Sequence, residues 1–409
     1  MTDIASSPTP TPEAQPSAPA ATIDPARQAQ AKRYAGLRRV LSLVDLAVGA
    51  VALVVVLVLG LHLRLRDALT SAGLGGQPWP FVLIAAYAAV YILGYTVLTF
   101  PLAIYGGFVL PHRFGLSRQG FGGWLGDQGK GLLLSLLFGL AVVEVMYLLL
   151  AKQPLTWWLW VAGIALIFTV VLANLAPVLL LPLFYKLTPM PEGELRDRLL
   201  RMAERAHTQV RGVYVMNMSR KTSEGNAALM GLGNTRRIVV GDTIVQEYTP
   251  DEIEVVLAHE LGHHVHADIW KGIAVQTALT LGGLALVNLA LHAIVAHAGF
   301  GFHGLADIAT LPVLLALFGI YGFVTGPLGN TYSRIIERQA DQYALDMTRD
   351  PASFISAFNR LANQNLAQLD PNPIIEALFY DHPAVGKRIR HAEQWQAAHQ
   401  TTRPVAPKP

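Results

Sequence analysis

The sequence predicts a mainly α-helical, polytopic membrane protein with about six transmembrane helices, a small α/β insertion and a helical C-terminal segment. Hydrophobic residues make up 52% of the 409 residues and charged residues only 14%, whereas about a quarter of an ordinary soluble domain is charged. Apolar runs of spanning length recur along the chain, and basic residues border them. These three observations carry the prediction.

Six apolar runs reach the length of about 20 residues that a bilayer-spanning helix needs. Trp157, Trp158 and Trp160 crowd the start of the fourth run, as aromatic residues do at a membrane interface. Buried helices of a large soluble core are the alternative interpretation, and six runs are too many for it. The runs cover about residues 40–63, 81–110, 132–151, 157–184, 273–298 and 308–329.

The runs divide the chain into regions. Residues 1–35 are rich in Pro and Ala and predict a disordered tail, and residues 396–409 predict a second one. Residues 36–184 form an N-terminal membrane domain with four spans, and residues 273–330 form a two-span hairpin. Residues 185–272 between them alternate helical and strand patterns, which predicts a small α/β insertion. Residues 331–395 predict a helical C-terminal segment.

Basic residues indicate the orientation in the membrane. They precede the first span, lie between the second and third, and follow the fourth and sixth, whereas the alternate loops contain only Arg64, Arg66 and Lys152. The positive-inside rule then places both termini and the polar segments in the cytoplasm. The net charge of +3 is small, so the basic residues predict contact with a lipid bilayer and no nucleic-acid partner.

Residues 259–263 read His-Glu-Leu-Gly-His, an HExxH motif. Thr249 and Pro250 predict the start of its helix, as a cap and a first helical residue. Because residues i and i+4 share a helix face, His259 and His263 can bind one metal ion. Glu260 lies beside that ion, where it can take a proton from a bound water molecule. The chain has no cysteine, so the third ligand is a carboxylate or another histidine.

The best candidate for the third ligand is Glu337, which shares a helix face with Asp341. One carboxylate can bind the metal while the other accepts a hydrogen bond from a ligand histidine and orients its ring. On spacing alone, a solvated charged helix paired with Arg334 and Arg338 remains the alternative.

Three further histidines need separate interpretations. His264 points away from the metal face, and His266 lies about two turns beyond His259, so both are predicted to be structural. His382 follows Asp381 and precedes Pro383, with Arg388 shortly after. If this segment folds over the metal, His382 and Arg388 can stabilise the oxyanion of a tetrahedral intermediate.

Taken in order, these motifs resemble the integral-membrane zinc metallopeptidases of the CAAX prenyl protease (a-factor-converting) type. The resemblance runs from about residue 113 to residue 388. It rests on a loop at 113–119 with Asp127 and Lys130, Asn226-Ala227 in a short strand, a basic strand ending at Asp242-Thr243, HELGH at 259–263, Ser333 to Asp341, and His382-Pro383 to Arg388.

This resemblance implies a zinc endopeptidase, in a bacterial inner membrane, whose helices surround an intramembrane chamber. One zinc ion per chain would be bound by His259, His263 and Glu337 in a zincin-like insertion on the cytoplasmic side. Glu260 and His382 would be catalytic, and Asp341 and Arg388 orienting. Asn226 and Ala227 would bind the substrate, a membrane-associated or CAAX-like peptide or protein, along an edge strand. The peptidase chemistry carries over; a requirement for a prenyl group does not.

Two alternative functions remain open at this stage. A heat-shock-type membrane quality-control metallopeptidase shares the HExxH motif and the Glu…Ala-Asp helix, but the element from His382 to Arg388 and the longer transmembrane set favour the CAAX type. A transporter or inactive zinc-holding membrane scaffold is the other. Glu260 has no purpose in a structural zinc site, and the fifth and sixth runs lack charged residues for a transport path.

Overall fold

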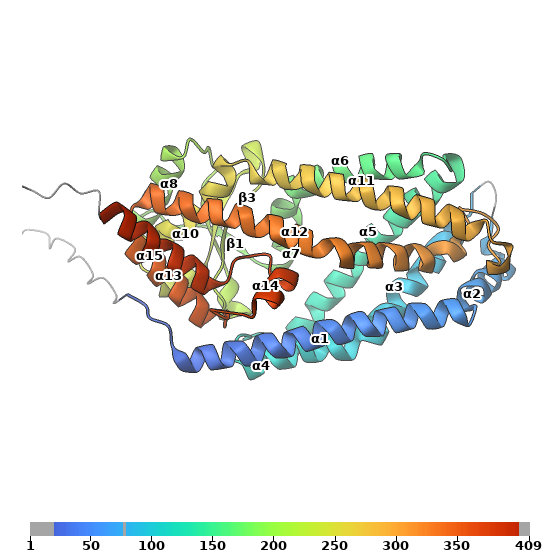
Figure 1. The fold of residues 1–409 in the computed structure, drawn as a ribbon, viewed down its shortest axis with the longest axis horizontal. Coiled ribbons are helices and arrows are strands. Elements are labelled where there is room, and N and C mark those ends of the chain that lie inside the picture. Colours follow the sequence, from blue (N-terminus) through green and yellow to red (C-terminus); the bar gives the residue numbers. More distant parts are fainter. Residues whose placement is uncertain (1–19, 77–78, 401–409) are drawn as a thin grey trace, which may run out of the picture.

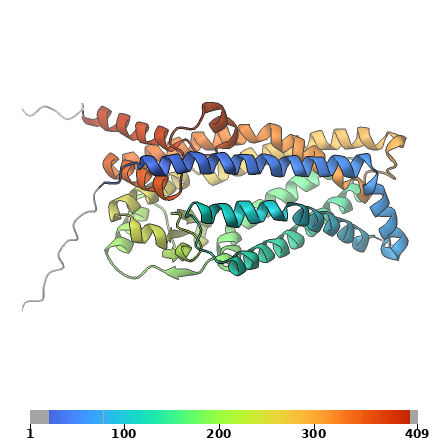
Figure 2. The same ribbon diagram turned by 90° about the horizontal axis from the view of Figure 1, so that it is seen from below.

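The computed structural model describes residues 20–76 and 79–400, which form an elongated bundle (Figure 1). The long helices run along its length, and the sheet and the C-terminal helices gather at one end. The first helix begins and the last helix ends at this same end in both views (Figures 1 and 2). Within the described residues, six helices are long and apolar enough to cross a membrane. They contain α1 (Pro25–Val58), α3 (Phe81–Ile104), α5 (Phe121–Lys152), α6 (Trp157–Leu175), α11 (Asp268–Val295) and α12 (Leu311–Thr348).

The spanning helices expose apolar side chains on their outer surfaces. Val97 of α3 is 74% exposed and Leu289 of α11 is 67% exposed. Exposure of many large apolar residues would be costly in water but is favourable against lipid. Three spans extend through short irregular turns: α3 into α4 (Leu110–Arg113), and α6 into α7 (Leu181–Phe184), each through a single π-turn, and α12 from a 3₁₀ turn at Ile308–Thr310. The predicted polytopic fold is confirmed.

The first predicted span is wrong at its end. Instead of running to residue 63, α1 ends at Val58, and Gly60 adopts a left-handed conformation with φ of 63° that turns the chain into α2 (Leu61–Leu69). Glycine takes this conformation without the steric cost that a Cβ would add.

Parts of the predicted disordered tails, residues 1–35 and 396–409, are ordered in the described residues. Asp24 accepts a hydrogen bond from the backbone N–H of Ala26 and Pro25 occupies the first turn, so α1 already begins at Pro25. The preceding segment is also tied down, since the N–H of Ala21 donates to Ser356 Oγ at 2.7 Å. At the other end, α15 (Val385–Gln400) includes residues 396–400. Residues 1–19 and 401–409 lie outside the described residues.

The insertion contains a four-stranded sheet, with strand order β1-β2-β4-β3 in the described residues. Parallel pairing joins β2 to β4, and antiparallel pairing joins β1 to β2 and β3 to β4. Three strands, β2, β3 and β4, form where the sequence predicted strand patterns, whereas β1 was not predicted; β3 lies at an edge. The elements are β1 (Leu187–Pro189), α8 (Glu194–Arg205), β2 (Val213–Met216), β3 (Ala227–Met230), β4 (Arg237–Gly241), α9 (Asp242–Glu247) and α10 (Pro250–Val265).

The C-terminal helices complete the core around α10. They are α13 (Pro351–Gln364), α14 (Pro373–Phe379) and α15. Phe354 and Phe358 of α13 are buried with Leu257 of α10 and Ala392 of α15 in one apolar cluster. This cluster packs against the helix that carries the HExxH motif, and Ala344 and Leu345 of α12 belong to it as well.

A buried ion pair closes the other end of the bundle. Arg66 Nη1 of α2 lies 2.5 Å from Asp307 Oδ2, in the loop before α12. The Asp307 side chain is only 2% exposed, and it also accepts hydrogen bonds from the backbone N–H groups of His303 and Ala309. Arg66 has a second partner in Asp67, which is 65% exposed. The pair therefore joins the start of the bundle to the last span.

We expect Asp307→Ala to destabilise the protein by about 3–5 kcal/mol, because it leaves Arg66 buried without its buried partner. The matched control is Asp67→Ala, which removes the exposed partner of the same arginine and should change the stability by less than about 1 kcal/mol. Thermal unfolding of both variants in one detergent measures the difference. Equal losses in the two variants would contradict the role of Asp307.

Candidate active site

The HExxH helix α10 is anchored at its first turn. Thr249 accepts a hydrogen bond from the N–H of Glu252, and the Glu252 carboxylate accepts one from the N–H of Thr249, which forms a capping box. The same carboxylate is buried and accepts hydrogen bonds from Ser356 Oγ at 2.5 Å and from the Arg360 guanidinium. One glutamate thus starts α10 and fixes it to α13.

The helix α12 packs closely against α10 and thereby brings Glu337 next to the two histidines of the motif. A Cβ atom on Gly262 would lie 3.0 Å from the Cα of Ala340 in α12, a closer contact than nearly all Cβ atoms make. The two backbones can approach this closely because both positions carry the smallest side chains. Glu337 precedes Ala340 by about one helical turn, so this contact places its carboxylate opposite the histidines.

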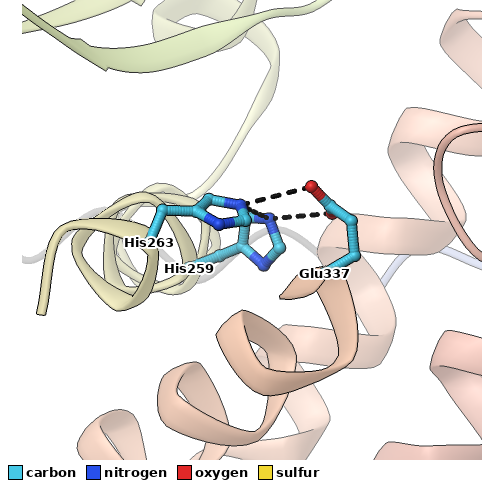
Figure 3. Close-up of side chains that lie close together, drawn as sticks. All are labelled: His259, His263 and Glu337. Atoms are coloured by element: carbon cyan, nitrogen blue, oxygen red, sulfur yellow. Dashed lines mark hydrogen bonds and ion pairs between the residues drawn. The ribbon is translucent and has the colours of Figure 1, made fainter. Parts of the chain in front are cut away.

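His259, His263 and Glu337 form a compact group in which all three side chains point toward one another (Figure 3). His259 Nε2 lies 3.2 Å from His263 Nε2. The two carboxylate oxygens of Glu337 each lie 3.3 Å from one of these nitrogens. Glu337 Oε2 is buried with no hydrogen-bond partner among the described residues. Three ligand atoms of suitable chemistry therefore converge on one point and could hold a metal ion.

The group attracts positive charge. Burial and the neighbouring Arg388 lower the pKa of His259, but the nearby carboxylates of Asp341 and Glu337 outweigh them and raise the pKa to about 9. An imidazole that is buried and next to an arginine would otherwise be neutral. The carboxylates around it thus create a potential that favours a cation at this position.

Asp341 and Arg388 lie behind His259. Asp341 Oδ1 is 3.0 Å from His259 Nδ1, and the side chain is 1% exposed. Arg388 donates to both oxygens of Asp341, at 2.8 and 2.5 Å, and its guanidinium lies 4.0 Å from the ring centre of Phe358. Arg388 Nη2 is also 3.2 Å from His259 Nδ1. This buried arrangement places both residues where they can orient the His259 ring, and it directs Arg388 to Asp341 instead of to a substrate.

Asp268 lies behind His263 as Asp341 lies behind His259, and the sequence did not predict it. Its Oδ2 lies 3.0 Å from His263 Nδ1, and its side chain is 3% exposed. Ala267 has a left-handed backbone with φ of 56°, which turns the chain at the junction of α10 and α11. Helical spacing alone puts residue 268 off the face of His263. The signal that could have found it is an aspartate directly after the motif helix, since ligand histidines usually have a carboxylate or carbonyl partner.

Glu260 and His382 lie on the accessible side of the group. Glu260 is partly exposed and makes no hydrogen bond or ion pair with the described side chains, so its carboxylate is available to a substrate or water. His382 Nε2 is 3.3 Å from Glu337 Oε1, and its side chain is 56% exposed. A hydrogen bond with Asp381, 2.9 Å away, raises the pKa of His382 above its ordinary value. His382 thus lies beside the metal group as a proton donor.

Asn226 and Ala227 lie at the start of β3. The carbonyl of Asn226 accepts a hydrogen bond from the N–H of Gly241 at 2.8 Å, and Asn226 itself is exposed just before the strand. Ala227 pairs with Val240 of β4. The opposite edge of β3 has no strand beside it in the described sheet. By contrast, His264 and His266 lie outside the metal group.

Two family models match the chain. Residues 189–396 match Peptidase family M48, and residues 10–186 match the CAAX prenyl protease N-terminal model, described as five membrane helices. The first match covers half of the chain. The chain belongs to peptidase family M48. It is therefore an integral membrane metalloprotease, and both the enzyme class and the family resemblance predicted from the sequence are confirmed.

Curated proteins and a solved structure agree with this membership. The chain is 29% identical to the uncharacterized metalloprotease YhfN of Bacillus subtilis, over 93% of this chain and 88% of that protein. It is 31% identical to the CAAX prenyl protease 1 homolog of Arabidopsis thaliana, over 71% of this chain and 68% of that protein. The crystal structure of S. mikatae Ste24p has the same fold, with a TM-score of 0.76 at 22% identity, covering 90% of this chain and 89% of that one.

We expect Asp268→Asn to lower the affinity for the metal about 10–100-fold, because the amide cannot accept the His263 proton as the carboxylate does. The control is Lys271→Gln, which removes a 51% exposed amine 3.6 Å from the same aspartate and should leave the affinity unchanged. Competition with a metal chelator measures both. If Asp268→Asn binds metal as the parent protein does, Asp268 does not orient His263.

Proposed function

We propose that this family M48 protein is a zinc endopeptidase that cleaves membrane-associated or CAAX-like peptides and proteins. One zinc ion per chain would be held by His259, His263 and Glu337. The observation that carries the proposal is the spacing of the candidate ligand atoms: the Nε2 atoms of His259 and His263 lie 3.2 Å apart, and each lies 3.3 Å from a different carboxylate oxygen of Glu337. Ligands about 2.0–2.1 Å from a tetrahedral zinc ion lie about 3.3 Å apart, so the residues fit the ion. Two histidines and a glutamate are also a known catalytic zinc set that leaves one position open.

Bound zinc would make water a stronger nucleophile and polarise the carbonyl of the peptide bond. Glu260 would accept the proton of the attacking water and pass it to the leaving amine. His382 would donate a hydrogen bond from Nε2 to the oxyanion that forms on the carbonyl oxygen. Asp341 and Asp268 would keep the Nδ1 protons of the two ligand histidines in place, and Arg388 would balance the charge of Asp341.

An extended substrate would bind along the open edge of β3. Addition of a peptide to an edge strand uses main-chain hydrogen bonds and therefore accepts many side chains. Asn226 and Ala227 lie at the end of this edge and would contact the substrate there. The name of the Arabidopsis thaliana relative refers to a CAAX prenyl protease, which supports a membrane-associated substrate; a prenyl group is not part of the proposal.

We further propose a bacterial inner membrane with the active site on the cytoplasmic side. The similarity to a Bacillus subtilis protein supports the first part. The basic residues at the sheet end of the bundle support the second, because they favour the cytoplasm. Residues 36–184 and 273–330 would then be the membrane domain, and residues 185–272 and 331–395 the catalytic one. Family membership and the unpaired carboxylate of Glu260 favour this peptidase over a transporter or an inactive scaffold.

Glu260→Gln tests the proposed base. We expect a folded protein that still binds zinc and has lost about 10²–10⁴-fold in cleavage rate, because the amide cannot accept a proton. Zinc content and cleavage of a fluorogenic peptide would be measured together. The exposed Glu194→Gln serves as the control and should retain full activity. Normal cleavage by Glu260→Gln would refute the mechanism.

Two adjacent histidines provide a matched test of the metal site. His263→Asn should abolish stoichiometric zinc binding and cleavage, since only two of the three ligands remain. His264→Asn changes the next residue, which lies outside the ligand group, and should keep both. Chelation of the parent protein should likewise stop cleavage, and added zinc should restore it. Zinc retained by His263→Asn would rule out the proposed ligand set.

A further inference from the structure

A cavity separate from the metal group lies where the membrane helices meet the sheet. Its volume is about 770 Å³, and it is bounded by the start of α5, the segment from α7 to β1, and residues of β2 and β4. None of the metal-group residues lines it. The cavity thus lies beside the sheet, at the ends of two candidate membrane spans.

The cavity carries an excess of positive charge. Its only lining carboxylate among the described residues, Asp127, is already satisfied: it accepts hydrogen bonds from Gln119 at 2.7 Å, Lys130 at 3.1 Å and Lys221 at 2.5 Å. Lys186, Arg220 and Arg237 also line the cavity and form no ion pair with a described carboxylate. Three cations are therefore available to an anionic ligand.

Aromatic rings form part of the same lining. The Lys221 amine lies 4.6 Å from the ring centre of Tyr185, and the Arg237 guanidinium lies 5.3 Å from that of Tyr214. Tyrosines concentrate at the membrane–water boundary because their rings are amphipathic. The two tyrosine rings keep the side chains of Lys221 and Arg237 at the edge of the cavity. A cavity in this position suits a polar group at the bilayer surface.

Apolar side chains continue the cavity toward the membrane core. On α5 the lining residues Gly126 and Lys130 are followed at helical spacing by Leu133 and Leu137, which are 68% and 63% exposed. On the facing wall, Leu183 lines the cavity and Leu179 precedes it by four residues, with 46% and 58% exposure. The polar end and the apolar continuation together match an amphiphile better than a free anion.

We propose that this cavity binds the phosphate headgroup of an anionic phospholipid from the leaflet on the side of the catalytic sheet. The phosphate lies among Lys186, Arg220 and Arg237, and the acyl chains lie along the exposed leucines of α5. Basic pockets between transmembrane helices bind acidic headgroups in this way. The proposal goes beyond the peptidase function and does not depend on it, because it concerns residues outside the metal site.

The test is lipid binding to the full chain in detergent, measured by native mass spectrometry. Phosphatidylglycerol, phosphatidylcholine and glycerol 3-phosphate are titrated separately. We expect phosphatidylglycerol to bind tightest, and Lys186→Gln/Arg220→Gln to weaken its binding roughly tenfold or more. Arg201→Gln/Arg211→Gln removes the same charge from exposed positions of the catalytic domain that do not line the cavity, and it should bind as the parent protein does.

Gly126→Leu tests the cavity without a change of charge. A Cβ at Gly126 meets no atom within 4 Å, so the leucine fits on α5 and fills space that the lipid needs. We expect a folded protein with phosphatidylglycerol binding reduced by a similar factor. Unchanged binding in both cavity variants overturns the proposal. The proposal is also overturned if glycerol 3-phosphate binds as tightly as the lipid, which assigns a free-phosphate site. It is overturned as well if a substrate peptide displaces phosphatidylglycerol only when the C-terminal carboxylate of the peptide is free.

Discussion

The near-contact of α10 and α12 is the constraint on which the site depends. Gly262 and Ala340 let the two backbones approach until the carboxylate of Glu337 lies 3.3 Å from the imidazole nitrogens of His259 and His263. A Cβ at Gly262 would require Ala340 to shift by a few tenths of an ångström, which is comparable with the tolerance of about 0.2 Å in the ligand distances of a metal site. The motif supplies two of the proposed ligands, and helix packing brings the third into place.

Electrostatic compensation holds this group together in a buried environment. Each ligand histidine has a nearly fully buried aspartate at its Nδ1, Asp341 for His259 and Asp268 for His263. Arg388 then balances Asp341, and the exposed Lys271 lies near Asp268. A buried carboxylate without such partners would be costly. The positive charge of the proposed metal ion would complete a sequence of alternating charges from the ion, through the histidines and aspartates, to Arg388 and Lys271.

The sequence predicted those parts of the site that follow from local periodicity. The faces shared by His259 and His263 and by Glu337 and Asp341, and the Thr249 cap, depend only on residues within two helical turns. Asp268 was missed because it reaches His263 through the left-handed turn at Ala267, which no helical spacing anticipates. The end of α1 at Gly60 was missed because the apolar pattern continues across the break. The roles of His382 and Asn226 depend on a bound substrate and remain predictions.

Other features required the folded chain. The Glu252 carboxylate joins α10 to Ser356 and Arg360 of α13, over a separation in sequence that no pattern reveals. The basic cavity combines residues from α5, the segment after α6 and three strands. Such sites arise from tertiary packing, so composition and spacing identify their residues only as isolated charges at the edges of apolar runs.

The continuity of α12 has a mechanical consequence. One helix of 38 residues runs from Leu311 near the far end of the bundle to Thr348, and it carries Glu337 in its last third. At about 1.5 Å per residue, the metal ligand is roughly 40 Å from the helix start. A change in tilt of about 3° in the membrane-spanning part would then move the carboxylate by about 2 Å if α12 stays rigid. Bilayer thickness influences helix tilt together with packing against neighbouring helices, so a tilt transmitted past Pro327 of α12 would couple it to the geometry of the proposed metal site.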